Sequence, residues 1–195
     1  MIKRWMPLLV IIGLIIITGL SLGGVYNRMV AAEEHVRTTF SNMDVQYQRR
    51  ADLIPNLVEV VKGYAAHEKD VFVEVTNARA KVGQIQIGNN LSLQRLQEYI
   101  NAQDALTQAL SRLMVVVEQY PQLKADQNFR ELQAQLEGTE NRIAFARNQY
   151  NEAVRGYNTL IRRFPNNLIA SMFSFGPYPY YEAEVGTQQA PKVKF

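Results

Sequence analysis

The stretch that decides the fold is residues 129–164, FRELQAQLEGTENRIAFARNQYNEAVRGYNTLIRRF. Its apolar residues recur at alternating spacings of three and four, with one polar interruption at Thr139. A period of 3.5 residues places these side chains on one face of a helix and is typical of left-handed helix–helix packing. At 1.5 Å per residue, such a helix is about 54 Å long. The segment therefore predicts a long helix that packs along its whole length against other helices.

Three further segments carry the same spacing and complete the expected bundle. They are residues 22–54, 57–82 and 96–120. Pro55 suits the first turn of a helix, glycines and asparagines punctuate residues 83–90, and Pro121 ends the third segment. The four helical segments predict an all-α fold with heptad packing. Because short connections make consecutive helices antiparallel, the long helices should form an up-down-up-down bundle.

An uncharged apolar run precedes the bundle. Residues 6–25 contain no charged side chain, and Lys3 and Arg4 lie before them. As a helix this run spans about 30 Å, the thickness of the hydrocarbon core of a bilayer. We therefore expect an N-terminal transmembrane helix whose basic flank stays in the cytoplasm. A cleaved signal peptide is the alternative, because Ser21 and Gly23 form a small-x-small site, but the length of the run favours a retained anchor.

Composition and charge exclude several classes of protein. The 195-residue chain is 47% hydrophobic and 20% charged, an ordinary globular balance, and it contains no cysteine for disulfides or thiolate metal sites. Four of the 21 basic residues lie at the chain ends, and the remaining 17 face 18 acidic residues. The body of the protein therefore lacks the basic face that nucleic acid binding requires, so we expect no nucleic acid partner.

Sequence motifs for catalysis or cofactor binding are missing. The two histidines are His35 and His67, and the His67-Glu68 pair lacks the second histidine of a zincin motif because residue 71 is Val71. The chain also has no GxGxxG, P-loop or GxSxG motif. We therefore expect no enzymatic activity, no cofactor and no metal site.

Polar residues interrupt the apolar faces at a small number of positions, and we interpret them as structural residues that set the register of the helices. They are Glu33, Arg50, Glu68 and Gln103, together with Glu118 near the end of the third helix. Because Arg49 and Arg50 should close the first helix, we expect one of them to form an ion pair at that end of the bundle. The expected partners are Glu118, Glu131 and Glu59.

The C-terminal tail, residues 166–195, is rich in aromatic side chains. Its candidate contact residues are Met172, Phe173, Phe175, Tyr178, Tyr180 and Tyr181. They suit the headgroup region of a membrane if the fourth helix returns to the membrane surface. Two alternatives stay open: the tail folds back onto its own bundle, or it exchanges between subunits through the alternating residues 192–195.

Several motifs in the chain resemble the LemA family. They are RRADLIPNLV (49–58), VKGY (61–64), His67-Glu68, EQYPQLK (118–124), LEGTENRI (136–143), Tyr150-Asn151, Tyr157-Asn158, Phe164-Pro165 and APKVKF (190–195). The resemblance extends from about Tyr26 to the end of the chain. It implies a bacterial, membrane-anchored helical protein, and it supplies no catalytic residues.

These observations predict three regions: a transmembrane anchor (1–25), a four-helix bundle (26–165) and an aromatic tail (166–195). We expect the protein to be a non-enzymatic scaffold or adaptor of the cell envelope. It should self-associate as a homo-oligomer and shape the membrane. It is expected in the bacterial inner membrane as a single-pass protein, with its N-terminus cytoplasmic and its bundle outside, in contact with the bilayer and with other envelope proteins. The alternative is a ligand-binding receptor or enzyme with a polar site between the helices.

Overall fold

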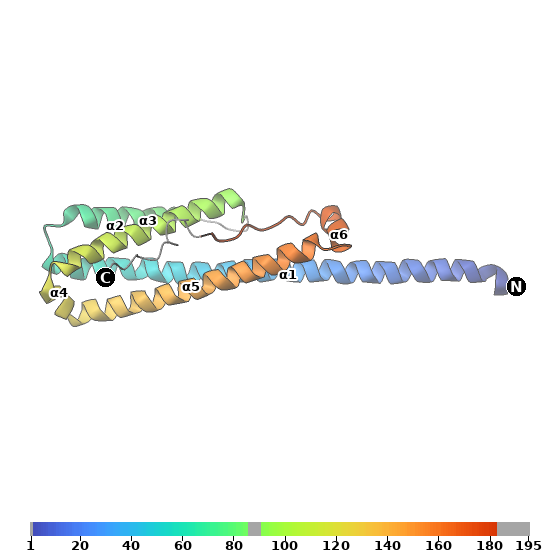
Figure 1. Ribbon diagram of the computed structural model, residues 1–195, viewed down its shortest axis with the longest axis horizontal. Helices are drawn as coiled ribbons and strands as arrows, with labels where there is room; N and C mark the ends of the chain where they lie inside the picture. Colours follow the sequence, from blue (N-terminus) through green and yellow to red (C-terminus); the bar gives the residue numbers. More distant parts are fainter. Residues whose placement is uncertain (1, 86–90, 183–195) are drawn as a thin grey trace, which may run out of the picture.

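The computed structural model describes residues 2–85 and 91–182, with only the backbone described at residues 2–12 and 14–21. The helices in these ranges are α1 (Ile2–Tyr64), α2 (Lys69–Gln84), α3 (Leu93–Glu118), α4 (Pro121–Ala125), α5 (Gln127–Arg162) and α6 (Asn166–Met172). The described ranges contain no strand. The directions of the long helices alternate along the chain (Figure 1). The expected all-α helical bundle is therefore confirmed.

Helix α1 is one continuous helix of 63 residues, about 95 Å long. It extends far beyond the other helices on its N-terminal side (Figure 1). The expected end of the first helix before Pro55 is therefore wrong, and the chain turns back only after Tyr64. We call the end of the bundle at Tyr64 the distal end.

The proline is tolerated because another helix supplies the missing hydrogen bond. Pro55 has no amide hydrogen, so it leaves the carbonyl of Ala51 without its partner four residues later. Nε of Arg79, on α2, donates to this carbonyl at 2.8 Å. The apolar spacing also continues through the proline, since Ile54, Leu57 and Val61 are all buried.

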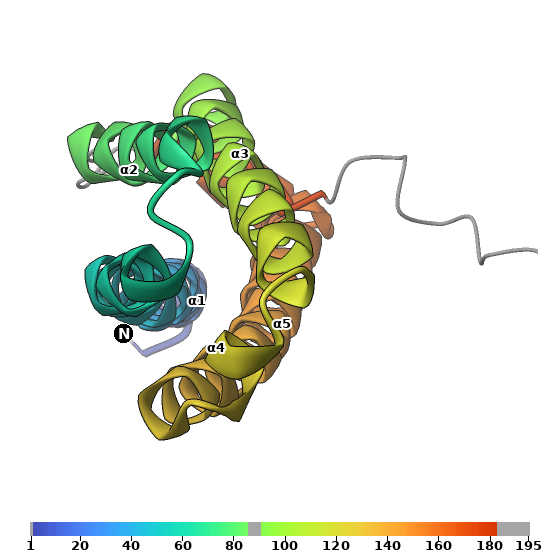
Figure 2. The same ribbon diagram turned by 90° about the vertical axis from the view of Figure 1, so that its left-hand side faces the viewer.

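The bundle consists of two antiparallel pairs. Helix α5 packs along α1, and α3 packs along the shorter α2. Viewed from the distal end, α3 lies between α2 and α5 (Figure 2). The N-cap of α5 is Asp126, whose carboxylate accepts the amide of Phe129 at 2.9 Å. The helix that the spacing of residues 129–164 predicts therefore begins two residues earlier, at Gln127.

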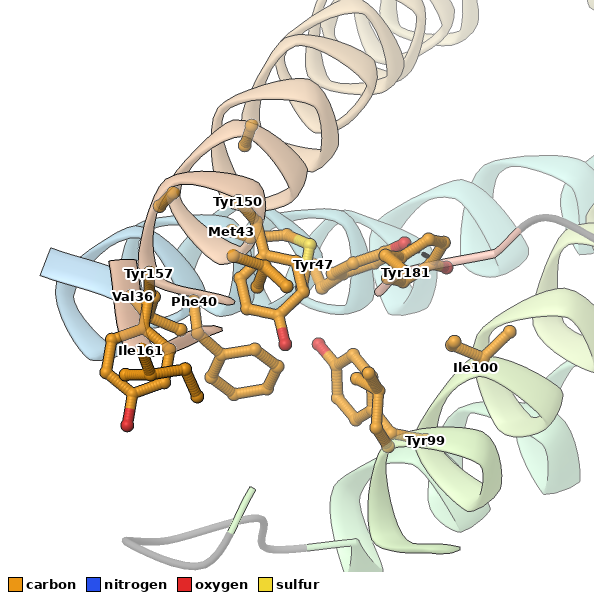
Figure 3. Close-up of a cluster of buried hydrophobic side chains, with 14 of the residues drawn as sticks. Val36, Phe40, Met43, Tyr47, Tyr99, Ile100, Tyr150, Tyr157, Ile161 and Tyr181 are labelled. Carbon is orange, nitrogen blue, oxygen red and sulfur yellow. Dashed lines mark hydrogen bonds between the residues drawn. The ribbon is translucent and has the colours of Figure 1, made fainter. Parts of the chain in front are cut away.

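The buried side chains form two clusters, one along each half of the bundle. The cluster nearer the tail includes Met43, Tyr47, Tyr99 and Tyr150 (Figure 3). The distal cluster joins α1, α2 and α3 with the start of α5. Leu110 and Leu136, which the 3-4 spacing places on inner faces of their helices, are only partly buried against it. Arg130 and Glu137, which lie outside this spacing, are exposed.

Within the part of the chain that the structure describes, none of the helices combines the length and the apolar character needed to cross a membrane. The side chains of most of the expected anchor, residues 2–12 and 14–21, lie outside the described residues.

Candidate functional site

A polar layer separates the two apolar clusters. It comprises Arg50 of α1, Gln103 and Thr107 of α3, and Glu140 of α5. Arg50 is 2% exposed, and its NH2 group donates to Oε1 of Gln103 at 2.7 Å and to the Gln103 carbonyl at 3.3 Å. Its NH1 group donates to Thr107 Oγ1 at 3.0 Å and to Glu140 Oε2 at 3.1 Å. Because the guanidinium of α1 binds both α3 and α5 at one level, the layer fixes the relative register of the three helices.

The ion pair of Arg50 with Glu140 corrects the expected pairing. Of the expected partners, Glu118 binds Lys124 at 2.6 Å and Glu59 binds Lys62 at 3.0 Å. The reason is the length of α1: because this helix continues to Tyr64, Arg50 lies several turns below the distal end. The carboxylate at its level therefore comes from the middle of α5.

A groove of about 1000 Å³ lies between α1, α2 and α3 beside this layer. Its lining includes Asp44, Arg79, Tyr99 and Gln103. Asp44 accepts the Tyr99 hydroxyl at 2.8 Å, and burial, followed by the charge of Asp44, raises the pKa of Tyr99 far above its usual range. Nε2 of Gln103 is buried and has no partner at hydrogen-bonding geometry. Gln103 therefore belongs both to the polar layer and to the lining of the groove.

The tail folds back onto α1 and α5 as an extended strap, which we define as residues 177–181. Asn158 donates from Nδ2 to the carbonyl of Tyr178 at 2.9 Å and accepts the amide of Tyr178 at 3.0 Å. Asn151 makes the same pair of bonds with Tyr181, at 2.9 Å and 2.8 Å. The hydroxyl of Tyr150 donates to the carbonyl of Pro179 at 2.8 Å. The strap is thus bound through its backbone.

Two tyrosine side chains of the strap reach helix α1. The hydroxyl of Tyr178 donates to Glu33 at 2.9 Å and accepts from Nε of Arg37 at 3.3 Å. Burial raises the pKa of Tyr178, although its hydrogen bond from Arg37 opposes this rise.

The hydroxyl of Tyr181 lies 2.7 Å from that of Tyr47 (Figure 3), which in turn accepts from Arg147 Nε at 2.6 Å. The guanidinium of Arg147 also lies over the Tyr181 ring, 4.7 Å from its centroid. Burial raises the pKa of both Tyr47 and Tyr181, so both phenols stay protonated at neutral pH.

The start of the tail behaves differently, because its apolar side chains face outward. Leu168, Met172 and Phe173 are all more than half exposed, as is Phe164 before α6. The ring of Phe173 packs against Tyr26 of α1, with centroids 4.8 Å apart. This exposed apolar surface therefore lies at the level of α1 where the uncharged run of residues 6–25 ends.

The structure brings together only some of the residues singled out from the sequence. Arg50 and Gln103 share the polar layer, Glu33 binds the strap, and Glu68 accepts the Tyr120 hydroxyl at 3.4 Å. Glu118 is exposed and distant from this layer.

The six candidate tail residues fall into two groups, one in contact with the bundle and one exposed. Tyr178 and Tyr181 are strap residues that reach the bundle, and Phe175 packs against it; Met172, Phe173 and Tyr180 are exposed. Residues 183–195, including the alternating residues 192–195, lie outside the described residues. Among the described residues, no three His, Asp or Glu side chains are grouped to hold a metal ion.

Sequence reasoning did not identify Asn151, Asn158, Arg79 or Arg147 as functional. A signal for the first two was present, because Tyr150-Asn151 recurs seven residues later as Tyr157-Asn158. Seven residues are close to two helical turns, so the repeat places both asparagines on one face of α5. No local signal marks Arg79 or Arg147.

Comparisons with known proteins identify relatives of this chain. Residues 39–195 match the LemA family. The chain is 29% identical over 175 residues to each of the magnetosome proteins MamQ 1 and MamQ 2 of Paramagnetospirillum magneticum. It is 26% identical over 174 residues to magnetosome protein MamQ of Magnetospirillum gryphiswaldense. These matches cover 80% of this chain but 64% of each relative, so the chain spans slightly less than two thirds of their length.

Proposed function

This chain belongs to the LemA family, and on that premise we propose that it is a membrane-anchored, non-enzymatic scaffold or adaptor of the bacterial cell envelope. The apolar run before the bundle is its single membrane anchor, and the basic flank of Lys3 and Arg4 keeps the N-terminus in the cytoplasm. The bundle then lies outside the inner membrane. Copies of the chain self-associate there, bind other envelope proteins and shape the bilayer.

One observation carries this proposal: α1 continues without a break from the apolar run into the bundle. A continuous helix transmits the orientation of an anchor to everything packed on it, because bending a helix requires a local disruption of its hydrogen bonds. The exposed apolar residues around α6 lie at the level of Tyr26, directly after this run. Arg162 and Arg163 flank them and are also exposed, which suits the negatively charged headgroup region.

The polar groups in the interior support a structural role. Arg50 binds both Gln103 and Glu140, which joins three helices, and Glu33 accepts a hydrogen bond from Tyr178 of the strap. Groups bound in this way hold the register of the bundle. The relatives that are named as magnetosome proteins are further support for a role in a bacterial membrane structure.

Topology can be tested in the complete protein, because the chain contains no cysteine. In the proposed topology, Ile2→Cys places a thiol in the cytoplasm and Ser111→Cys places one outside the inner membrane. In cells with a permeabilised outer barrier, an impermeant maleimide should label Ser111→Cys and should label Ile2→Cys only after lysis. The opposite pattern, or release of the protein from membranes by alkaline carbonate, contradicts the proposal. Tubulation of giant vesicles by the purified chain tests the membrane-shaping role.

A ligand-binding receptor is a second candidate, favoured by the buried and unused donor of Gln103 beside the groove. A ligand that accepts a hydrogen bond there should raise the melting temperature of the natural protein in a thermal screen. The same ligand should raise the melting temperature of Gln103→Leu much less. Equal shifts in both proteins would argue against this site.

A further inference from the structure

The contacts of Asn151 and Asn158 are those of a peptide-binding surface, the strap groove, which is the surface of α1 and α5 that the strap covers and is a different place from the groove beside Gln103. Each amide side chain binds both the N–H and the C=O of a single strap residue, which is recognition of a peptide backbone irrespective of its side chain. The two asparagines are about 10.5 Å apart along α5. Three residues of extended chain, from Tyr178 to Tyr181, span about 10 Å. The groove therefore fits the repeat of an extended peptide that runs antiparallel to α5.

Side chains around the groove select a particular peptide. Glu33 and Arg37 bind the hydroxyl of the first tyrosine. Tyr47 binds the hydroxyl of the second, and Arg147 lies over its ring. The prolines of the strap hold it extended before binding, which reduces the entropy lost when it binds. The preferred sequence is thus Tyr-Pro-x-Tyr, as at residues 178–181 of this chain.

The strap is joined to the bundle by a short connection. The amide of Phe175 still binds the carbonyl of Ala170, at 2.9 Å, and the amide of Tyr178 already binds Oδ1 of Asn158, at 3.0 Å. Gly176 between them is exposed and has no atoms near the position of a Cβ. Ser174 has a φ of 60°, a left-handed conformation that is strained for a residue with a side chain. This conformation is part of the turn that ends α6, which the amide of Phe175 closes.

We propose that the groove between α1 and α5 is an interaction site for a second copy of this chain, whose strap replaces the chain's own. An exchanged pair makes every contact of the single chain twice, so exchange forfeits none of the binding described above. The occupant is a second copy because both tyrosine hydroxyls have dedicated partners, and every copy carries the matching sequence. The inference rests on the self-association proposed above and names the contact that produces it.

A complementation experiment with full-length chains in detergent or nanodiscs tests this exchange. The groove variant carries Asn151→Ala and Asn158→Ala, and the strap variant carries Tyr178→Ser and Tyr181→Ser. Each alone lacks one half of the contact and should not associate. Mixed together, the intact groove of one should bind the intact strap of the other. Each groove of the groove variant loses four hydrogen bonds, two from each asparagine, so this variant alone should run at the mass of a single chain.

The measurements are the mass of each purified species and the recovery of one tagged variant with the other. Asn148→Ala, at an exposed position of the same helix, is the matched control and should associate like the natural protein. Circular dichroism establishes that each variant is folded. If a variant does not fold, a synthetic peptide of residues 175–182 supplies the second test, because it should dissociate the natural oligomer by occupying the groove.

The outcomes separate the two proposals. Association restored only in the mixture supports strap exchange, as does dissociation by the peptide. If both variants alone remain oligomeric, strap exchange is overturned while self-association stands. If the natural protein is a monomer in nanodiscs at high density, self-association itself is overturned, and the strap binds only its own chain.

Discussion

The hydrogen bond from Arg79 to Ala51 should be energetically coupled to Pro55. In Arg79→Met the apolar part of the side chain remains, but the carbonyl of Ala51 loses the donor that stands 2.8 Å away. A hydrogen bond from a charged group contributes about 1.5–3 kcal/mol. Because Arg79 is half-buried and water can partly replace it, we expect a loss of about 1–2 kcal/mol in unfolding free energy.

The second step of the prediction is to restore the backbone donor. In Pro55→Ala, the amide of residue 55 can bind the carbonyl of Ala51, as in an ordinary helix. Arg79→Met should then cost less than about 0.5 kcal/mol, which gives a coupling energy of about 1 kcal/mol between the two positions. No such coupling is expected for Lys81→Met, an exposed residue on the same helix.

The assay is urea unfolding of the four full-length proteins of this cycle, followed by far-ultraviolet circular dichroism at constant detergent concentration. Transition midpoints and slopes give the four unfolding free energies, provided that the slopes agree. If Arg79→Met costs the same in both backgrounds within about 0.3 kcal/mol, the reasoning is refuted. The proline would then be tolerated for a reason unrelated to Arg79.

Three further predictions concern pH and the core. Burial raises the pKa of Tyr157 to about 12, so the unfolded chain loses the phenol proton at a lower pH than the folded protein does. The midpoint of urea unfolding should therefore fall as the pH rises from 10 towards 12. It should fall less steeply in Tyr157→Phe. The hydrogen bond from the amide of Phe129 lowers the pKa of Asp126, so this cap stabilises the protein above about pH 4 and is lost on acidification. Asp126→Ala should therefore lower the melting temperature at pH 7. The melting temperature of this variant should also decrease less on acidification than that of the natural protein. Leu113→Ala should cost about 2–5 kcal/mol by urea unfolding, and the partly buried Leu136→Ala clearly less; equal losses would contradict the observed burial.

The sequence predicted most helices because their signals are local. The 3-4 spacing of residues 129–164 predicts a helix of 36 residues, and α5 has this length with a shift of two residues. Ser92 caps α3 and Pro121 begins α4, so these boundaries also follow from neighbouring residues. The same spacing continues from Ile54 through Leu57 to Val61, and it outweighs the local preference of Pro55 to begin a helix.

The candidate site was only partly predictable, because periodicity identifies the inner face of a helix but not its partner. Arg50 and Gln103 could be recognised as polar residues on inner faces, and both are buried. Their meeting depends on which levels of α1 and α3 coincide, and the misplaced end of α1 shifted the expected partner of Arg50. The carboxylate it binds is 90 residues away in sequence.

The amino-acid sequence by itself determined the long helices, their inner faces, the uncharged run at the N-terminus and the aromatic character of the tail. Only the tertiary structure decided that α1 passes through Pro55, that Arg50 binds Glu140, and that the tail divides into an exposed part and a bound strap. The helices follow from hydrogen bonds and apolar spacing within a few residues. The other features depend on donors from distant segments, such as Arg79 for Ala51 and Asn158 for Tyr178, and these are in reach only when the helices have packed.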